Sequence, residues 1–163
     1  MKIKDIKVKE NIMEFTLDKG SNAMANALRR VMMQEVPVMA VDEVDFFENT
    51  SSIFDEFIAH RIGLVPLVTD LDAYRLPEDC DEKDCNKCST VLNLEVKGPG
   101  TVYSKELKAE DKKSKPVEGE IPITKLREGE TLKLEARARL GKGKQHARHQ
   151  ACTCTYKAKG KEE

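Results

Sequence analysis

Apolar residues recur every three to four positions between residues 21 and 37, in the stretch SNAMANALRRVMMQEVP. This spacing is typical of an amphipathic helix, with one apolar stripe made by Met24, Ala27, Leu28 and Val31. Ser21 or Asn22 can cap the first turn, because a short side-chain oxygen accepts from a backbone N–H that lacks a partner. Pro37 lacks an N–H and ends the run. A second face of the predicted helix carries Asn22, Asn26, Arg29, Arg30 and Met33.

The residues before this helix alternate between apolar and polar side chains. Alternation predicts strands over residues 2–9 and 12–18, and Glu10 and Asn11 supply a turn between them. A hairpin and one helix bury too little apolar surface to fold alone. We therefore expect an exposed apolar surface here, which needs a further element or another chain.

The remainder of the chain is expected to be mainly β. Alternating patterns predict strands over residues 38–48, 89–97, 101–107, 129–140 and 151–157. Pro122, between two isoleucines, suits an edge strand or a bulge. The predicted fold class is therefore α+β, a hairpin and helix followed by a mainly antiparallel β part.

One further helix is predicted after a polar break at residues 49–52. Ser52 and Asp55 have the spacing of a capping box, and Gly63 can close the helix in the left-handed conformation. The expected apolar face is Phe54, Phe57, Ile58 and Ile62.

Charge and composition exclude several function classes. The 163 residues include 28 Lys or Arg and 29 Asp or Glu, so no global basic field predicts nucleic-acid binding. No apolar run approaches the ~18 residues of a membrane span, and the first residues lack a signal-peptide core. A cytoplasmic location is expected. In that reducing compartment the five cysteines are not expected to form a framework of disulfide bonds.

The strongest chemical signal is the spacing Cys80-x4-Cys85-x2-Cys88. Thiolates at this spacing can share one tetrahedral zinc ion, with the fourth ligand from a nearby acidic residue. Such a metal would have a structural role, since it would clip a loop with little core of its own. The alternative is a degenerate cluster of thiols without metal.

Other candidate residues have simpler interpretations. Cys152 and Cys154 would point to one face of a strand, where buried thiols are the favoured interpretation over extra metal ligands. His60, His146 and His149 are not accompanied by a nucleophile motif or a glycine-rich phosphate loop. Catalysis by this chain alone is not expected.

Three segments resemble one family. The stretch NALRRVMMQEVP resembles the NALRR helix of the alpha-like assembly subunits of RNA polymerase, which include the bacterial alpha amino-terminal domain, its archaeal counterpart and the third-largest subunit of eukaryotic polymerase II. DEFIAHRIGLVPL, residues 55–67, is similar to the archaeal and eukaryotic members but not to bacterial alpha. Residues 141–148, GKGKQHAR, are similar to the family's G-x-GKEHAKW loop, with Gln145 for the acid, Arg148 for the lysine and His149 for the aromatic residue. The order of these segments most resembles the archaeal members of the family.

The resemblance implies a non-catalytic scaffold for transcription. Residues 1–37 would be the first part of a dimerisation domain, residues 38–157 an inserted domain, and residues 158–163 a charged tail. The expected partners are a small alpha-like subunit, subunit L in archaea, and the second-largest and largest subunits, without sequence-specific DNA contact. The subunit-interface residues implied by the motifs are Asn26, Leu28, Arg29, Arg30, Val31, Asp55, Glu56, His60, Arg61, Gly63, Pro66, Gly143 and His146.

The resemblance also sets expectations for metals and chain length. Several members carry a zinc-binding cluster in the inserted domain, usually with four cysteines, whereas three are local here. Members continue past this region with further strands, a long helix and in many archaea a ferredoxin-like insertion. The present sequence ends at Glu163, so a truncated piece or one half of a split subunit is expected, and an Fe–S cluster is not. The alternative hypothesis is a stand-alone zinc-stabilised protein-binding module.

Overall fold

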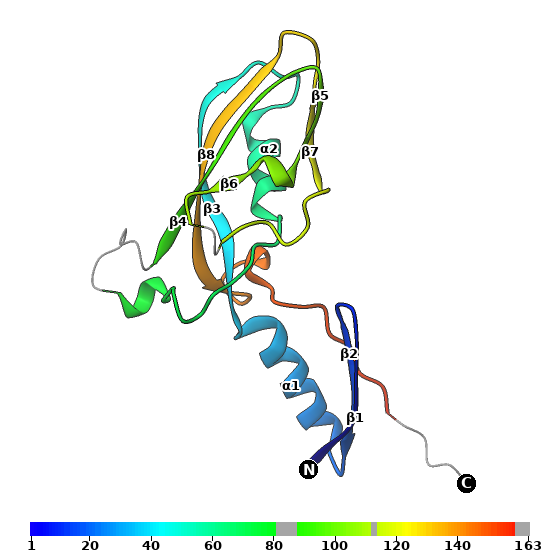
Figure 1. The fold of residues 1–163 in the computed structure, drawn as a ribbon. Helices are drawn as coiled ribbons and strands as arrows, with labels where there is room; N and C mark the ends of the chain where they lie inside the picture. The colour runs from blue at the N-terminus through cyan, green and yellow to red at the C-terminus, as the bar shows by residue number, and fades with distance from the viewer. Residues whose placement is uncertain (81–87, 112–113, 159–163) are drawn as a thin grey trace.

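The computed structural model describes residues 1–80, 88–111 and 114–158. A hairpin and the helix α1 lie at one end of an elongated molecule, and a β-rich body lies at the other (Figure 1). The chain therefore forms the predicted α+β fold, with strands that pair antiparallel.

The hairpin consists of β1 (Lys2–Lys9) and β2 (Ile12–Asp18), as predicted. Its register shifts between Lys4 and Lys7, where Asp5 adopts a φ of 53° and forms a bulge. Glu10 at φ 52° makes the turn between the strands. The two ends of the hairpin are joined by an ion pair of 2.7 Å between Lys4 and Asp18.

Helix α1 (Asn22–Gln34) also follows the prediction. The Ser21 hydroxyl accepts a hydrogen bond of 3.2 Å from the Met24 amide and caps the first turn. The helix ends at Glu35, whose amide bonds to the Val31 carbonyl, and the next strand begins at Pro37. No residue of α1 is buried within the described chain.

The body is a four-stranded sheet in the order β3-β8-β4-β6. These strands are β3 (Pro37–Asn49), β8 (Thr131–Lys142), β4 (Ser89–Lys97) and the short β6 (Lys108–Ala109). A two-stranded ribbon joins β5 (Gly100–Tyr103) to β7 (Pro122–Leu126), with a register shift beside Pro122. One core contains side chains of β8, β4, the ribbon and helix α2 (Asp55–Gly63). Single 3-10 turns occur at Pro77–Asp79, Ser104–Glu106 and Ala147–His149, so the strand predicted over 101–107 is confirmed only in its first half.

The start of α2 differs from the prediction. The helix begins after Phe54, which makes no side-chain capping bond, so the capping box of Ser52 and Asp55 is wrong. The Asp55 carboxylate instead accepts a bond of 2.6 Å from the side-chain amide of Asn49, at the end of β3. The Asp55 side chain is thus paired with the preceding strand, and no side chain caps α2.

The apolar face and the end of α2 also need correction. Ile58 and Ile62 are fully buried as predicted, but Phe54 is 73 % exposed and Phe57 also faces outward. Gly63 is the last helical residue, and Leu64 ends the helix at φ −96°, so a left-handed glycine cap is wrong. Gly63 lies against β3, where an added Cβ would be 3.6 Å from the Val41 carbonyl oxygen.

The strand predicted over residues 151–157 is wrong. These residues form no strand, because no other described strand lies beside them to complete a ladder. The prediction that Cys152 and Cys154 are buried is wrong for the same reason: Cys152 is exposed and Cys154 half-buried. Among the described residues, no helix is long and apolar enough to cross a membrane.

Candidate interaction surfaces

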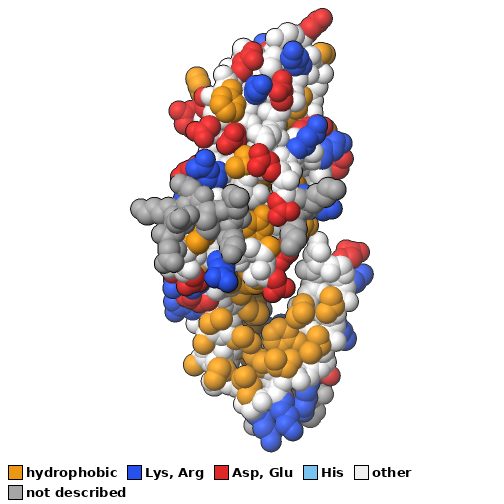
Figure 2. All heavy atoms as spheres, turned by 60° about the vertical axis from the view of Figure 1, so that its left-hand side comes forward, with side chains coloured by type: hydrophobic (Ala, Val, Ile, Leu, Met, Phe, Trp, Pro, Cys, Tyr) orange, Lys and Arg blue, Asp and Glu red, His pale blue; other side chains and the backbone are white. Residues whose placement is uncertain are grey.

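An exposed apolar surface lies on the hairpin and α1. The exposed apolar side chains there are Ile3, Ile6, Val8, Ile12, Met13, Met24 and Val31. Val8 is 66 % exposed and Val31 50 % exposed, whereas the apolar core positions of the sheet are below 5 %. Figure 2 shows hydrophobic side chains gathered at this end of the molecule. A contiguous apolar patch of this kind marks an interaction site in a folded protein, and it agrees with the predicted exposed surface.

The two neighbouring arginines of α1 have different environments. Arg29 donates from Nε and Nη2 to the Asn26 side-chain oxygen, both at 3.1 Å, and from Nη1 to the Met33 sulfur at 3.4 Å. Its guanidinium is therefore held along its own helix. Arg30 is exposed. Leu28, Asn26 and Arg29 are half-buried, so this face of α1 is partly covered within the chain.

A second candidate surface joins two segments that are far apart in the sequence. Helix α2 and the turn at residues 146–148 border a cavity of about 260 Å³ beside β3. The predicted interface residues His60, Gly63 and His146 all line this cavity. Arg61 of the same helix donates 2.5 Å to the Pro122 carbonyl and ties α2 to β7. Asp55, Glu56 and Pro66 are exposed but do not line the cavity.

The turn at the cavity is held by Arg148. Its Nη1 donates to the carbonyl oxygens of Val41 and Asp42, each at 3.0 Å, and to the Asp42 carboxylate at 3.2 Å. These carbonyls belong to the outer edge of the sheet, where no described strand pairs with β3. Arg148 thus provides a hydrogen-bond donor for two carbonyl groups of this edge strand.

His149 has a structural position that the sequence did not reveal. It is 6 % exposed, and its Nδ1 lies 3.0 Å from the Val38 carbonyl. Burial lowers the pKa of His149 below its ordinary value, although the Val38 carbonyl opposes the shift. Gly141 leaves the space for the ring, since a Cβ there would lie 2.6 Å from it. Gly141, eight residues before His149, was the feature of the sequence that could have indicated this packing.

Gly143 contacts the chain's own helix. A Cβ at this position would collide with the Met33 carbonyl oxygen and come within 3.2 Å of Gln34 Cα. The Lys144 amide donates 3.2 Å to the Gln34 carbonyl, and the Lys144 ammonium lies 3.3 Å from the Glu35 carboxylate. The Cys152 thiol reaches the Met32 carbonyl at 3.7 Å. We name residues 141–152 the joint, because Gly143, Lys144 and Cys152 of this segment contact the last carbonyls of α1.

The predicted metal ligands lie partly outside the described residues. Cys80 is half-buried and Cys88 fully buried, whereas Cys85 is outside the described ranges. Among the residues that the structure describes, no group of three or more His, Cys, Asp or Glu side chains has a metal-binding arrangement. The zinc site therefore stays a prediction.

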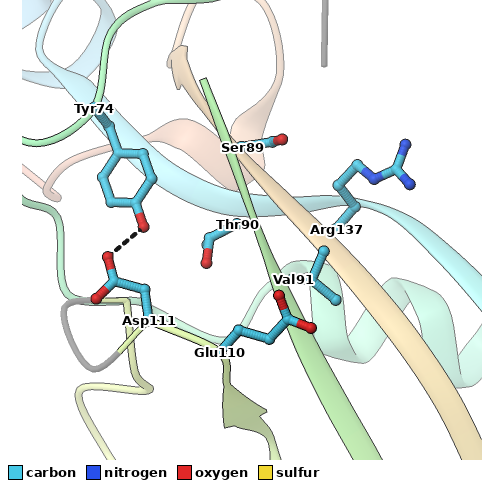
Figure 3. A pocket seen from close by; sticks show the side chains of 7 residues that line it. All are labelled: Tyr74, Ser89, Thr90, Val91, Glu110, Asp111 and Arg137. Carbon is cyan, nitrogen blue, oxygen red and sulfur yellow. Dashed lines mark hydrogen bonds between the residues drawn. The ribbon is translucent and has the colours of Figure 1, made fainter. Parts of the chain in front are cut away.

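A polar cavity that the sequence did not indicate lies beside the start of β4. Its volume is about 450 Å³, and Figure 3 shows the side chains that line it. The Tyr74 hydroxyl donates 2.7 Å to the Asp111 carboxylate, across 37 positions of sequence. Glu110, Thr90 and Arg137 add further polar groups. The cavity can hold water or a small polar group.

These features define an α+β protein with exposed apolar side chains on its hairpin and on α1. Residues 43–154 match the RNA polymerase Rpb3/RpoA insert domain. The chain belongs to this family.

Curated relatives extend the similarity to the amino-terminal end. The chain is 46 % identical over 157 residues to DNA-directed RNA polymerase subunit Rpo3 of Pyrococcus horikoshii, a match that covers 96 % of the chain and 59 % of the relative. It is 43 % identical over 161 residues to the Rpo3 subunit of Methanothermobacter thermautotrophicus, with 94 % and 61 % covered. The chain thus spans about three fifths of the length of these relatives.

Proposed function

We propose that this chain acts as a non-catalytic assembly subunit of DNA-directed RNA polymerase. Its relatives carry the name of an RNA polymerase subunit and share its sequence along nearly the whole chain. The observation that carries the proposal is the apolar surface of the hairpin and α1. A helix without one buried residue cannot owe its position to a core of its own, so another surface must cover it.

The chemistry of that surface fits a permanent partner. Exposed Val, Ile and Met side chains gathered on one surface are typical of obligate interfaces, which resemble a domain core cut in half. The proposed occupant is a smaller alpha-like subunit, which would pack against α1. The insert domain would then contact the two large subunits through surfaces such as the α2 cavity.

Zinc binding remains part of the proposal. Cys80, Cys85 and Cys88 would hold one structural ion, which would fix the segment before β4. Cys88 directly precedes β4, so a metal here would anchor the start of that strand.

Co-purification tests the proposal. The tagged chain is expressed in an archaeal host together with its polymerase subunits, and the recovered proteins are identified by mass spectrometry. We expect a small alpha-like subunit and the large subunits in the recovered material. Recovery of the folded chain without any polymerase subunit would refute the assembly function. Val31→Ser is the matched variant, since it should reduce recovery of the small subunit while the sheet remains folded.

A further inference from the structure

We propose that the cavity between α2 and the turn at residues 146–148 binds an acidic side chain of a partner protein. The proposal rests on the assembly function for the identity of the complex. It goes further by naming the chemical group that the cavity recognises and the residues that recognise it.

The acceptor groups that β3 brings to the cavity are already used. The carbonyl oxygens of Val41 and Asp42 and the Asp42 carboxylate all accept from Arg148. The Asp42 carboxylate also lies 3.9 Å from the Arg139 guanidinium. An incoming donor would have to compete with these charge-assisted bonds, which are among the stronger bonds in proteins.

The histidine donors of the cavity, in contrast, have no partner in the described chain. His146 accepts at Nδ1 from the amide of Arg148 at 3.2 Å and from its Nε at 3.1 Å. Since Nδ1 accepts, the neutral ring carries its hydrogen on Nε2. This N–H and the ring of His60 have no hydrogen-bond partner in the described part of the chain. The cavity therefore offers hydrogen-bond donors to whatever enters it.

Apolar atoms provide the remaining walls. Val41 is buried, Val44 is half-buried, and Leu64 reaches the cavity from the end of α2. A Glu or Asp side chain fits this combination, because its methylene groups can contact the valines and leucine while its carboxylate accepts from His146 and His60. A carboxylate makes stronger bonds with such donors than a neutral carbonyl.

Arg148 is a positioning residue in this scheme. It ties the turn to β3 and sets which nitrogen of His146 carries the hydrogen. Its replacement would release the turn, so the test uses His146 and His60, which are exposed and lie outside the core.

The first experiment compares recovery of polymerase subunits by the tagged chain and its variants. We expect His146→Leu to weaken retention of one large subunit about ten- to hundred-fold, the loss typical of a hydrogen bond to a charged group. His146→Gln keeps an N–H donor and should stay within a few-fold of the original chain. Lys125→Leu, an exposed position on β7 away from the cavity, is the control and should bind normally. His146→Leu also loses the two bonds that Nδ1 accepts from Arg148, so His60→Leu is measured beside it. The His60 ring has no hydrogen-bond partner in the described chain, so His60→Leu should keep the thermal stability of the original chain and still lose retention of the large subunit.

The second experiment identifies the bound group. A photo-crosslinking amino acid at position 64, which borders the cavity and leaves both histidines in place, should capture a partner segment that contains an Asp or Glu. Changing that acid to Lys should abolish retention, and combining it with His146→Glu should restore it.

The outcomes separate the two proposals. Equal retention of His146→Leu and the original chain, or a crosslinked segment without an acid, would overturn the acidic-group proposal and leave the assembly function intact. If the original chain recovers no polymerase subunit, the assembly function fails. The crosslink at position 64 then still decides the cavity, because capture of a segment whose Asp or Glu is needed for the crosslink supports it and the absence of any crosslink overturns it.

Discussion

Gly143 is predicted to control how α1 is joined to the β-rich body. In Gly143→Ala, the new Cβ would collide with the Met33 carbonyl oxygen. Both atoms belong to backbone segments, so rotation of a side chain cannot relieve the contact. Forcing an extra methyl group into such a site costs about 1–3 kcal/mol.

The molecule can relieve this strain in the joint alone. No residue of α1 is buried, and the ion pair between Lys144 and Glu35 is exposed and contributes little. We therefore expect local separation of the joint from α1 and no unfolding of the sheet. At a factor of ten for every 1.4 kcal/mol, protection of the Lys144 amide, which bonds to the Gln34 carbonyl, should fall about 5- to 150-fold.

Hydrogen exchange measured by NMR is the direct assay. Amides of the central strand, such as Leu134, should keep their protection. Gly20→Ala is the matched control, since its Cβ would be 3.5 Å from the nearest side-chain atom, an ordinary contact. Unchanged protection of the Lys144 amide in Gly143→Ala would show that the close approach of Gly143 to α1 is not what holds the joint.

Three further outcomes are expected. Burial lowers the pKa of His149 below 6.5, so on acidification the unfolded chain takes up the proton first. His149 therefore contributes stability above about pH 6.5 that is lost as the pH falls toward its folded-state pKa. The urea midpoint should fall less between pH 7.5 and 5 in His149→Gln than in the original chain, and an equal fall in both would contradict this. Gly63→Ala should leave stability unchanged or raise it by up to about 1 kcal/mol in thermal unfolding, because the helix gains a better former and the Cβ has room; a large loss would mean that α2 and β3 pack more closely than described. Elemental analysis should find about one zinc in each purified chain, and Cys88→Ser should lose it. An original chain that is as stable without metal as with it would exclude the site.

Local patterns determined much of this fold before any tertiary contact was known. The hairpin, α1, β4 and β8 lie close to where alternation and helical spacing predict them. Ser21 caps α1 as expected, and residues such as Leu134 face the core. These features depend on backbone bonds and side chains only a few positions apart, so the sequence carries their signal directly. The exposed apolar surface of α1 was predictable too, because a hairpin and one helix have too little surface to bury each other.

The tertiary structure decided everything that depends on distant partners. No side chain caps α2, because Asp55 is paired instead with Asn49 at the end of β3. Residues 151–157 form no strand, because no described strand pairs with them. The motifs at His60 and His146 carry no information on their distance, and only the packing of α2 against β3 brings them to one cavity. Gly143, expected at a subunit interface, lies against the chain's own α1. Sequence spacing sets local geometry, whereas these contacts arise from the long-range packing of the sheet, which no short pattern encodes.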